Sequence, residues 1–117
     1  MSESKLMSYI KSDFASKSDM RVGAEEWQKI IEEMLPKFKK AGAIRQTVSQ
    51  IWNKEGVFRL GTMWEYKDEK AFIACQKLFR EAEMKFDQKA QISVKDFSNR
   101  GIILYDIILT NSLYQTR

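Results

Sequence analysis

Residues 44–79 carry the pattern that most constrains the fold, because their periodicity predicts a strand, a turn, a second strand and a helix in succession. Lys54–Gly56 forms the turn, where Gly56 can adopt the positive φ that such a loop needs. In Val57–Tyr66 large apolar residues alternate with other residues, which is typical of a strand with one buried face. That face comprises Phe58, Leu60, Thr62, Trp64 and Tyr66. We therefore expect strands at Ile44–Asn53 and Val57–Tyr66, with Asp68 as the N-cap of the helix.

The segment before this stretch predicts one strand and one helix. Leu6–Phe14 alternates as a strand does, and Ala15–Val22 is rich in serine and is expected to be a loop. Gly23–Ala41 has apolar residues three and four positions apart, which favours a helix. Pro36 removes one backbone donor, so we expect a kink in one bent helix, and Gly42 is a natural stop.

The segment after it predicts a second helix and a last strand. The helix runs from about Glu69 to at least Glu83, with Phe72, Cys75 and Phe79 on its apolar side. Residues 85–99 show only a weak pattern and are expected to be a loop with partial structure; Ile92 and Val94 alternate briefly as in a short strand, and further helix is the alternative. Gly101–Leu109 is rich in β-branched residues and is expected to be the last strand, with an extension to Tyr114 left open.

The predicted order, strand–helix–strand–strand–helix–strand, is that of a ferredoxin-like domain. This α+β fold has a four-stranded antiparallel sheet with two helices on one face. Right-handed crossovers place the strands in the order 4-1-3-2. We expect residues 1–117 to form one such domain.

The chain contains no histidine, and this excludes several kinds of site. Ser-His-Asp catalysis, His-ligated haem and most zinc geometries all need an imidazole. A general base would be a carboxylate, lysine, tyrosine or water. We therefore expect neither a metal nor a cofactor, and a colourless protein that is insensitive to chelators.

Charge and cysteine content limit the partners and the compartment. The net charge is +4, but basic residues are mixed with 16 acidic ones along the whole chain, which favours a solvated surface over a nucleic-acid site. No apolar run approaches the ~18 residues of a membrane span, and the start lacks the pattern of a secretory signal. Cys75, the one cysteine, fits a reducing cytoplasm.

The segment Glu65–Phe72 resembles the strand-to-helix signature of antibiotic-biosynthesis-monooxygenase-like domains, in which an aromatic and a few charged residues precede Ala-Phe. With the topology, this is similar to the dimeric α/β-barrel superfamily. The resemblance implies dimers that pair sheet face to sheet face, and members include cofactor-free oxygenases of polycyclic phenols, haem-degrading enzymes and lactone isomerases. Haem degradation is not expected, because Cys75 and Gln76 stand where those relatives have histidine and Leu6–Phe14 lacks their asparagine.

Trp64, Tyr66 and Arg59 are the candidate residues for binding a substrate. Trp64 and Tyr66 face the helices and either line a cleft or serve as core aromatics. Arg59 points to the opposite face, where it either holds an anion or forms a salt bridge. Cys75 is expected to be an inert buried thiol, and Asp106 is either exposed or paired at a dimer contact.

Two functions are compatible with these features. The first is a cofactor-independent monooxygenase-like enzyme, or a binder, of a small aromatic or polyketide-like molecule. The second is a structural or regulatory dimer without catalysis, whose pocket is filled by its own side chains.

A homodimer is expected in either case, because two helices cover only one face of a four-stranded sheet. Met63 lies on the uncovered face, and the apolar residues of Gly101–Leu109 would form an exposed edge strand. A second copy that presents the same face would cover both.

Overall fold

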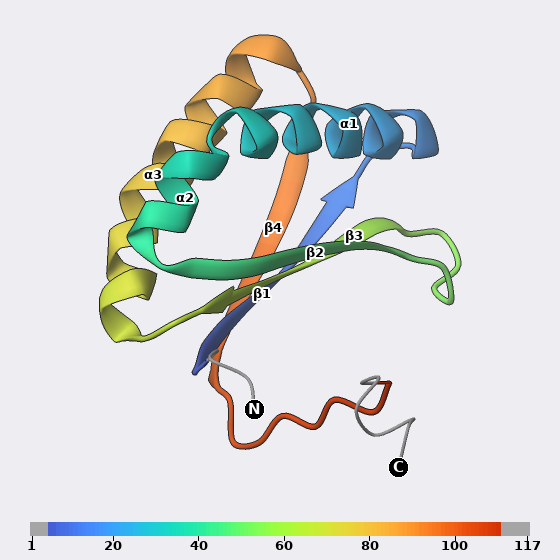
Figure 1. The fold of residues 1–117 in the computed structure, drawn as a ribbon. Helices are drawn as coiled ribbons and strands as arrows, with labels where there is room; N and C mark the ends of the chain where they lie inside the picture. The colour runs from blue at the N-terminus through green and yellow to red at the C-terminus, as the bar shows by residue number, and fades with distance from the viewer. Residues whose placement is uncertain (1–4, 111–117) are drawn as a thin grey trace.

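The computed structural model describes residues 5–110 as a four-stranded antiparallel sheet with three helices on one face (Figure 1). The strands are β1 (Leu6–Phe14), β2 (Ala43–Ile51), β3 (Phe58–Tyr66) and β4 (Val94–Ile102). The helices are α1 (Lys17–Glu33), α2 (Leu35–Ala41) and α3 (Glu69–Lys89). The sheet order is β2-β3-β1-β4, so the predicted fold class and strand order are confirmed.

The first helix begins earlier than predicted, because the segment Ala15–Val22 is mostly helical. Ser16 is the N-cap, and its hydroxyl accepts a hydrogen bond from the Asp19 backbone amide at 3.0 Å. Gly23 is not a helix start but a buried position inside α1. A Cβ there would lie 2.6 Å from the Phe14 ring, so glycine lets α1 approach β1 closely.

Pro36 divides the predicted bent helix into two helices. It lies in the first turn of α2, where its missing amide is tolerated, and Met34 separates α1 from α2. The apolar stripe nevertheless continues through the break, since Ile30, Met34 and Phe38 are all buried. Gly42 ends α2 at φ 102°, as its type predicts.

The third helix extends beyond Glu83, the minimum end that the sequence predicts. The position predicted for the last strand is wrong. Asp68 is the N-cap of α3, as predicted, and accepts a hydrogen bond from Ala71 N at 2.8 Å. Phe86 extends the buried side of α3, and β4 follows at 94–102 in place of the predicted 101–109. All nine β4 residues pair with β1, which fixes the strand length, so residues 103–110 lie beyond the sheet. The predicted extension to Tyr114 falls outside the described residues.

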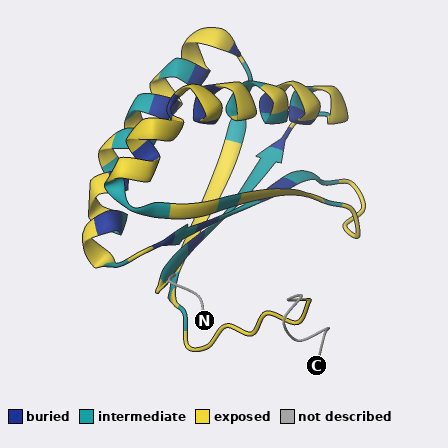
Figure 2. Cartoon of the chain, in the orientation of Figure 1, coloured by how far each residue is buried: buried dark blue, intermediate teal, exposed yellow. Residues whose placement is uncertain are grey.

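The main core lies between the helices and β3. Trp64, Tyr66 and Cys75 are buried there, as the alternation of β3 and the stripe of α3 predict. β4 is exposed over most of its length (Figure 2). The edge strand therefore carries polar residues, and this is why its pattern is weak in the sequence.

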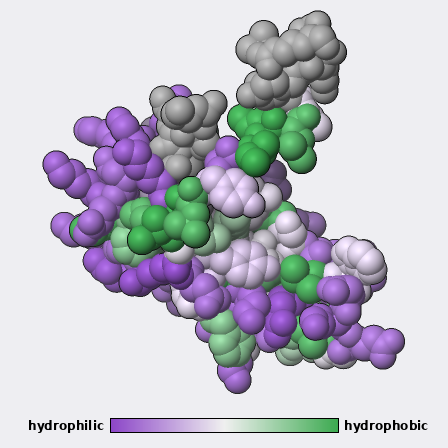
Figure 3. All heavy atoms as spheres, turned by 90° about the horizontal axis from the view of Figure 1, so that it is seen from below, coloured by the Kyte–Doolittle hydropathy of each residue, from purple (hydrophilic) through white to green (hydrophobic). Residues whose placement is uncertain are grey.

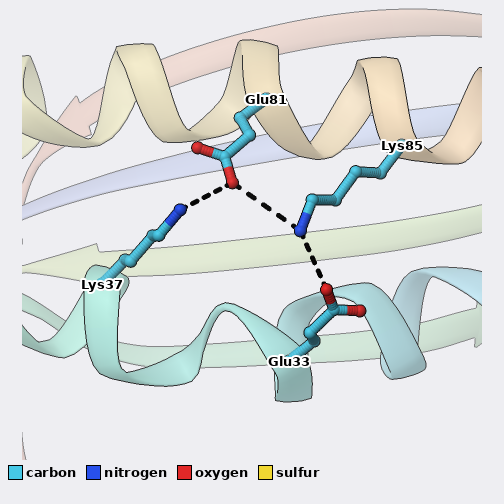
Figure 4. A network of polar contacts seen from close by, with 4 residues as sticks. All are labelled: Glu33, Lys37, Glu81 and Lys85. Atoms are coloured by element: carbon cyan, nitrogen blue, oxygen red, sulfur yellow. Dashed lines mark hydrogen bonds and ion pairs between the residues drawn. The ribbon is translucent and has the colours of Figure 1, made fainter.

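Ion pairs hold α3 against the two preceding helices at the surface (Figure 4). Lys85 of α3 contacts Glu33 at 3.0 Å, and Lys37 of α2 contacts Glu81 at 2.9 Å. Lys85 also lies 3.7 Å from Glu81, which joins the two pairs into one network. Because these groups are exposed to solvent, we expect them to set the register of the helices more than the stability.

Candidate functional site

A cleft of about 230 Å³ lies between the helix-facing side of the sheet and helices α1 and α3. Its apolar wall comes from Trp27 and Ile31 of α1, Phe72 and Phe79 of α3, and Trp64 of β3. Trp64 packs in a cluster of three rings, since its centroid lies 4.8 Å from that of Phe38 and 5.0 Å from that of Phe79, and these two rings lie 5.5 Å from each other. The cleft thus presents aromatic surfaces whose orientation is fixed before any ligand arrives.

The floor of the cleft is polar along β1 and β4. Ser8 and Ser12 lie on β1, and their register partners on β4 are Arg100 and Asp96. The Ser12 hydroxyl donates a hydrogen bond to Asp96 Oδ1 at 2.7 Å. The Arg100 guanidinium lies over the Phe72 ring, 4.9 Å from its centroid. The polar groups of the floor thus form two sets along the strands, with Ser12 and Asp96 at one and Ser8 and Arg100 at the other.

Glu83 of α3 is the second carboxylate of the cleft. Burial raises the pKa of this carboxyl, the charges of Asp96 and Asp87 raise it further, and Arg80 opposes the shift. Since a carboxylate with a raised pKa is a stronger base, Glu83 is a candidate proton acceptor among the residues that line the cleft.

A second cavity of about 310 Å³ adjoins the first. Trp27, Glu83 and Asp96 line both, so they form the boundary between the two spaces. Trp27 is stacked on Phe86 with ring centroids 4.7 Å apart, and this contact fixes its indole.

The structure separates the three residues that the sequence singled out. Trp64 lines the cleft, whereas Tyr66 is buried beneath it and its hydroxyl lies 2.9 Å from Ser8 Oγ. Burial raises the pKa of Tyr66 to about 12. Arg59 lies on the opposite face, where it forms two hydrogen bonds with Asp13, one of them at 2.9 Å. Arg59 lowers the pKa of the Asp13 carboxyl.

Glu83, Asp96 and Arg100 were not found from the sequence. Asp96 and Arg100 lie on β4, where the sequence predicts a loop with partial structure up to residue 99 and the last strand only from residue 101. The signal was present as Asp96, Ser98 and Arg100, which alternate at strand spacing on one face. Their polar character concealed a strand that has no buried apolar side.

Neither the thiol nor the carboxylates form a metal site in the described part of the chain. Cys75 is fully buried, and burial raises its pKa to about 11, so the thiol is protonated at neutral pH. Among residues 5–110, no group of three or more histidine, cysteine, aspartate or glutamate side chains could hold a metal ion. No helix within that range is both long and apolar enough to cross a membrane.

The fold and cleft define a ferredoxin-like α+β domain with a space between sheet and helices. Residues 3–103 match the model of the family described as Domain of unknown function (DUF6974), and the chain belongs to this family. A search of curated proteins finds no match.

Solved structures with the same fold include both small domains and an enzyme. Two dimeric ferredoxin-like proteins from uncultured marine organisms are similar at 23% and 22% identity, with TM-scores of 0.75 and 0.80. They cover 89% and 90% of this chain, and 99% of each of those chains is covered. The monooxygenase from the gene ActVA-Orf6 of Streptomyces coelicolor, in complex with Nanaomycin D, is similar at 9% identity and TM-score 0.67, over 92% of this chain and 95% of that one.

Proposed function

We propose that this protein binds a small planar aromatic molecule that carries an ionisable hydroxyl, in the cleft between sheet and helices. The observation that carries the proposal is the pairing of a fixed aromatic wall with a polar floor in one space of about 230 Å³. A cavity of roughly 150 Å³ holds one benzene ring, so this cleft suits one or two fused rings.

Each side of the ligand has a matching group in the cleft. Trp64 and Phe79 supply faces and edges for stacking on the rings. Arg100 supplies donors for a phenolate oxygen. Glu83 supplies the acceptor for the hydroxyl proton, and its raised pKa suits that exchange.

The reaction that this arrangement supports is oxygenation by dioxygen without a cofactor. The fold shared with a monooxygenase is consistent with it. With 1-naphthol, Glu83 takes the hydroxyl proton and dioxygen adds to the electron-rich ring carbon opposite the oxygen. Loss of water from the hydroperoxide gives the quinone: 1-naphthol + O₂ → 1,4-naphthoquinone + H₂O.

Binding is tested by thermal unfolding with 1-naphthol and, as a matched probe without the hydroxyl, naphthalene. We expect 1-naphthol at millimolar concentration to raise the Tm more than naphthalene, because binding to the folded state stabilises it by mass action. Arg100→Gln should remove the difference between the probes. Arg45→Gln, on an exposed part of β2, should keep it. Equal shifts for both probes in the unaltered protein would contradict the role given to the hydroxyl.

Turnover is tested with an oxygen electrode and by the absorbance of the quinone. We expect Glu83→Gln to lower the rate about 10²–10⁴-fold while 1-naphthol still raises the Tm. Glu25→Gln, at an exposed position of α1, is the control and should leave the rate unchanged.

A second candidate function is binding without turnover, as a regulatory dimer. It is favoured by the state of the two buried nucleophiles, since Tyr66 is hydrogen-bonded to Ser8 and both Tyr66 and Cys75 have raised pKa values. A rise in Tm with 1-naphthol and no oxygen consumption would select this function over the first.

The proposal includes a homodimer formed through the open sheet face, the face away from the helices. Met7, Tyr9, Met63 and Phe97 lie there and are partly exposed. Seen from below, the molecule shows hydrophobic groups and groups of intermediate hydropathy bordered by hydrophilic ones (Figure 3). The similar ferredoxin-like proteins are described as dimeric. Light scattering coupled to size exclusion should give twice the 13.8 kDa of one chain, and Met63→Lys should halve the measured mass.

The single cysteine also supports a location in the reducing cytoplasm.

A further inference from the structure

The segment that follows β4, residues 103–110 and here called the apolar arm, carries large hydrophobic side chains into solvent. Leu104 is 90% exposed, Leu109 82% and Tyr105 80%, and Ile107 and Ile108 are also exposed. Figure 1 draws the arm as an extended trace that leaves the end of β4 and lies apart from the helices. Its first residue is still anchored, because Ile103 N donates to Lys5 O at 2.9 Å. So many exposed apolar groups in one segment mark a surface that is covered in the working protein.

The sequence of the arm favours an extended course over a return to its own sheet. Ile102–Leu109 contains no glycine, proline, asparagine or serine, and Asp106 is its one residue of a type that is common in tight turns. Its β-branched and aromatic residues instead favour an extended backbone. Eight extended residues reach roughly 25 Å, which exceeds the roughly 15 Å width of four paired strands.

The pattern of the arm indicates that it is covered on both sides. Ile103, Tyr105, Ile107 and Leu109 alternate with Leu104, Asp106 and Ile108, and Asp106 is the one charged residue. A segment lying on a single surface needs only one apolar side. A segment between two surfaces needs two, and a pair of facing sheets provides them.

We propose that the apolar arms are exchanged, so that the arm of each protomer lies on the open sheet face of a second copy of this chain. The inference rests on the proposed dimer and goes beyond it by naming the exchanged segment. The receiving surface is the partly exposed set Met7, Tyr9, Met63 and Phe97. Tyr9 lies flat across the sheet here, since a Cβ on Gly61 would be 2.5 Å from its hydroxyl oxygen. We expect two arms and two faces together to bury more than the ~1,200 Å² at which specific interfaces begin.

The first test alters the arm and measures mass. Light scattering on the full chain should show a dimer, and Leu104→Lys with Ile107→Lys should give a monomer that keeps its far-ultraviolet circular dichroism. Leu35→Lys changes an equally apolar, exposed position on α2 and should leave the mass unchanged. A dimer of the same dissociation constant in the arm variant would overturn the proposal.

The second test shows on which chain the arm lies. A benzophenone side chain is placed at Ile107. The ¹⁵N-labelled and unlabelled chains are mixed, unfolded and refolded together, and the sample is then irradiated. We expect crosslinked peptides that join a heavy arm to a light sheet face and the reverse. Crosslinks only within heavy or only within light chains, in a sample of dimer mass, would overturn the exchange and leave the dimer intact. A monomer mass would overturn both, whereas ligand binding is measured independently by the naphthol shift.

Discussion

The Tyr66 hydroxyl is buried, and Ser8, also buried, is its hydrogen-bond partner. Removing one partner leaves the other buried hydroxyl without its side-chain partner. We expect Tyr66→Phe to lower the free energy of unfolding by about 1–2 kcal/mol. Ser8→Ala should cost a similar amount, and the double variant less than the sum of the two. Urea unfolding measures all three, and strict additivity would show that the contact contributes nothing.

The pH dependence of stability follows from the same side chain. The pKa of Tyr66 is raised from 10.0 to about 12 by burial, so the folded state keeps a proton that the unfolded state loses. This contribution to stability is complete below pH 10.0 and is lost as the pH rises towards about 12. Across this pH window, the free energy of unfolding should fall less steeply with pH for Tyr66→Phe than for the unaltered protein. Parallel curves would contradict the assignment.

At the scale of single residues, the sequence predicted the positions of buried groups better than those of the cleft. Trp64 and Tyr66 were placed on the helix-facing side because an apolar strand face alternates visibly. Which of them lines a space depends on packing, and packing left Trp64 at the cleft and Tyr66 beneath it. Glu83 could not be predicted as a candidate, because its raised pKa comes first from burial, which depends on packing, and then from Asp96 of β4 together with Asp87 of its own helix.

At the scale of elements, Gly42 joins the end of α2 to the start of α3. Its carbonyl accepts a hydrogen bond from Lys67 N at 3.0 Å, and a Cβ would lie 2.6 Å from that of Ala71. Gly42→Ala should cost about 1–2 kcal/mol for its positive φ and more for the clash. Gly56→Ala is the matched control, since it also has a positive φ but no atom within 4 Å of the added Cβ. Thermal unfolding should therefore show the larger loss for Gly42→Ala, and equal losses would contradict the close approach.

Element boundaries were predicted where a local signal fixes them and missed where a distant contact does. Asp68 and Gly42 cap their helices through neighbouring backbone groups, so residue type was sufficient. β4 was missed because its limits are set by pairing with β1, with Leu6 opposite Ile102. Most of the apolar run that was predicted to be the last strand belongs to the apolar arm. Its apolar composition fits burial against a partner and does not indicate a place in the sheet.

At the scale of the whole molecule, the fold class could be predicted because order and period together leave few topologies. The open sheet face was predicted for the same reason, since helices of one side cannot reach the other. What the sequence could not show is that the exposed apolar residues lie outside the sheet, because a β-branched run is compatible with either place.

Because β4 pairs only with β1, this pairing also determines when the sheet can be completed. A growing chain presents β1 first, yet one of its two neighbours is made only after all three helices. β2, β3 and the helices can associate through shorter loops, whereas the β1–β4 contact closes nearly the whole chain. We expect φ-values near zero for substitutions in β4 and higher values in β3 and α3, measured from folding and unfolding rates. Until β4 is in place, one of the two hydrogen-bonding edges of β1 is unpaired. The nascent protein is most exposed to aggregation during that interval.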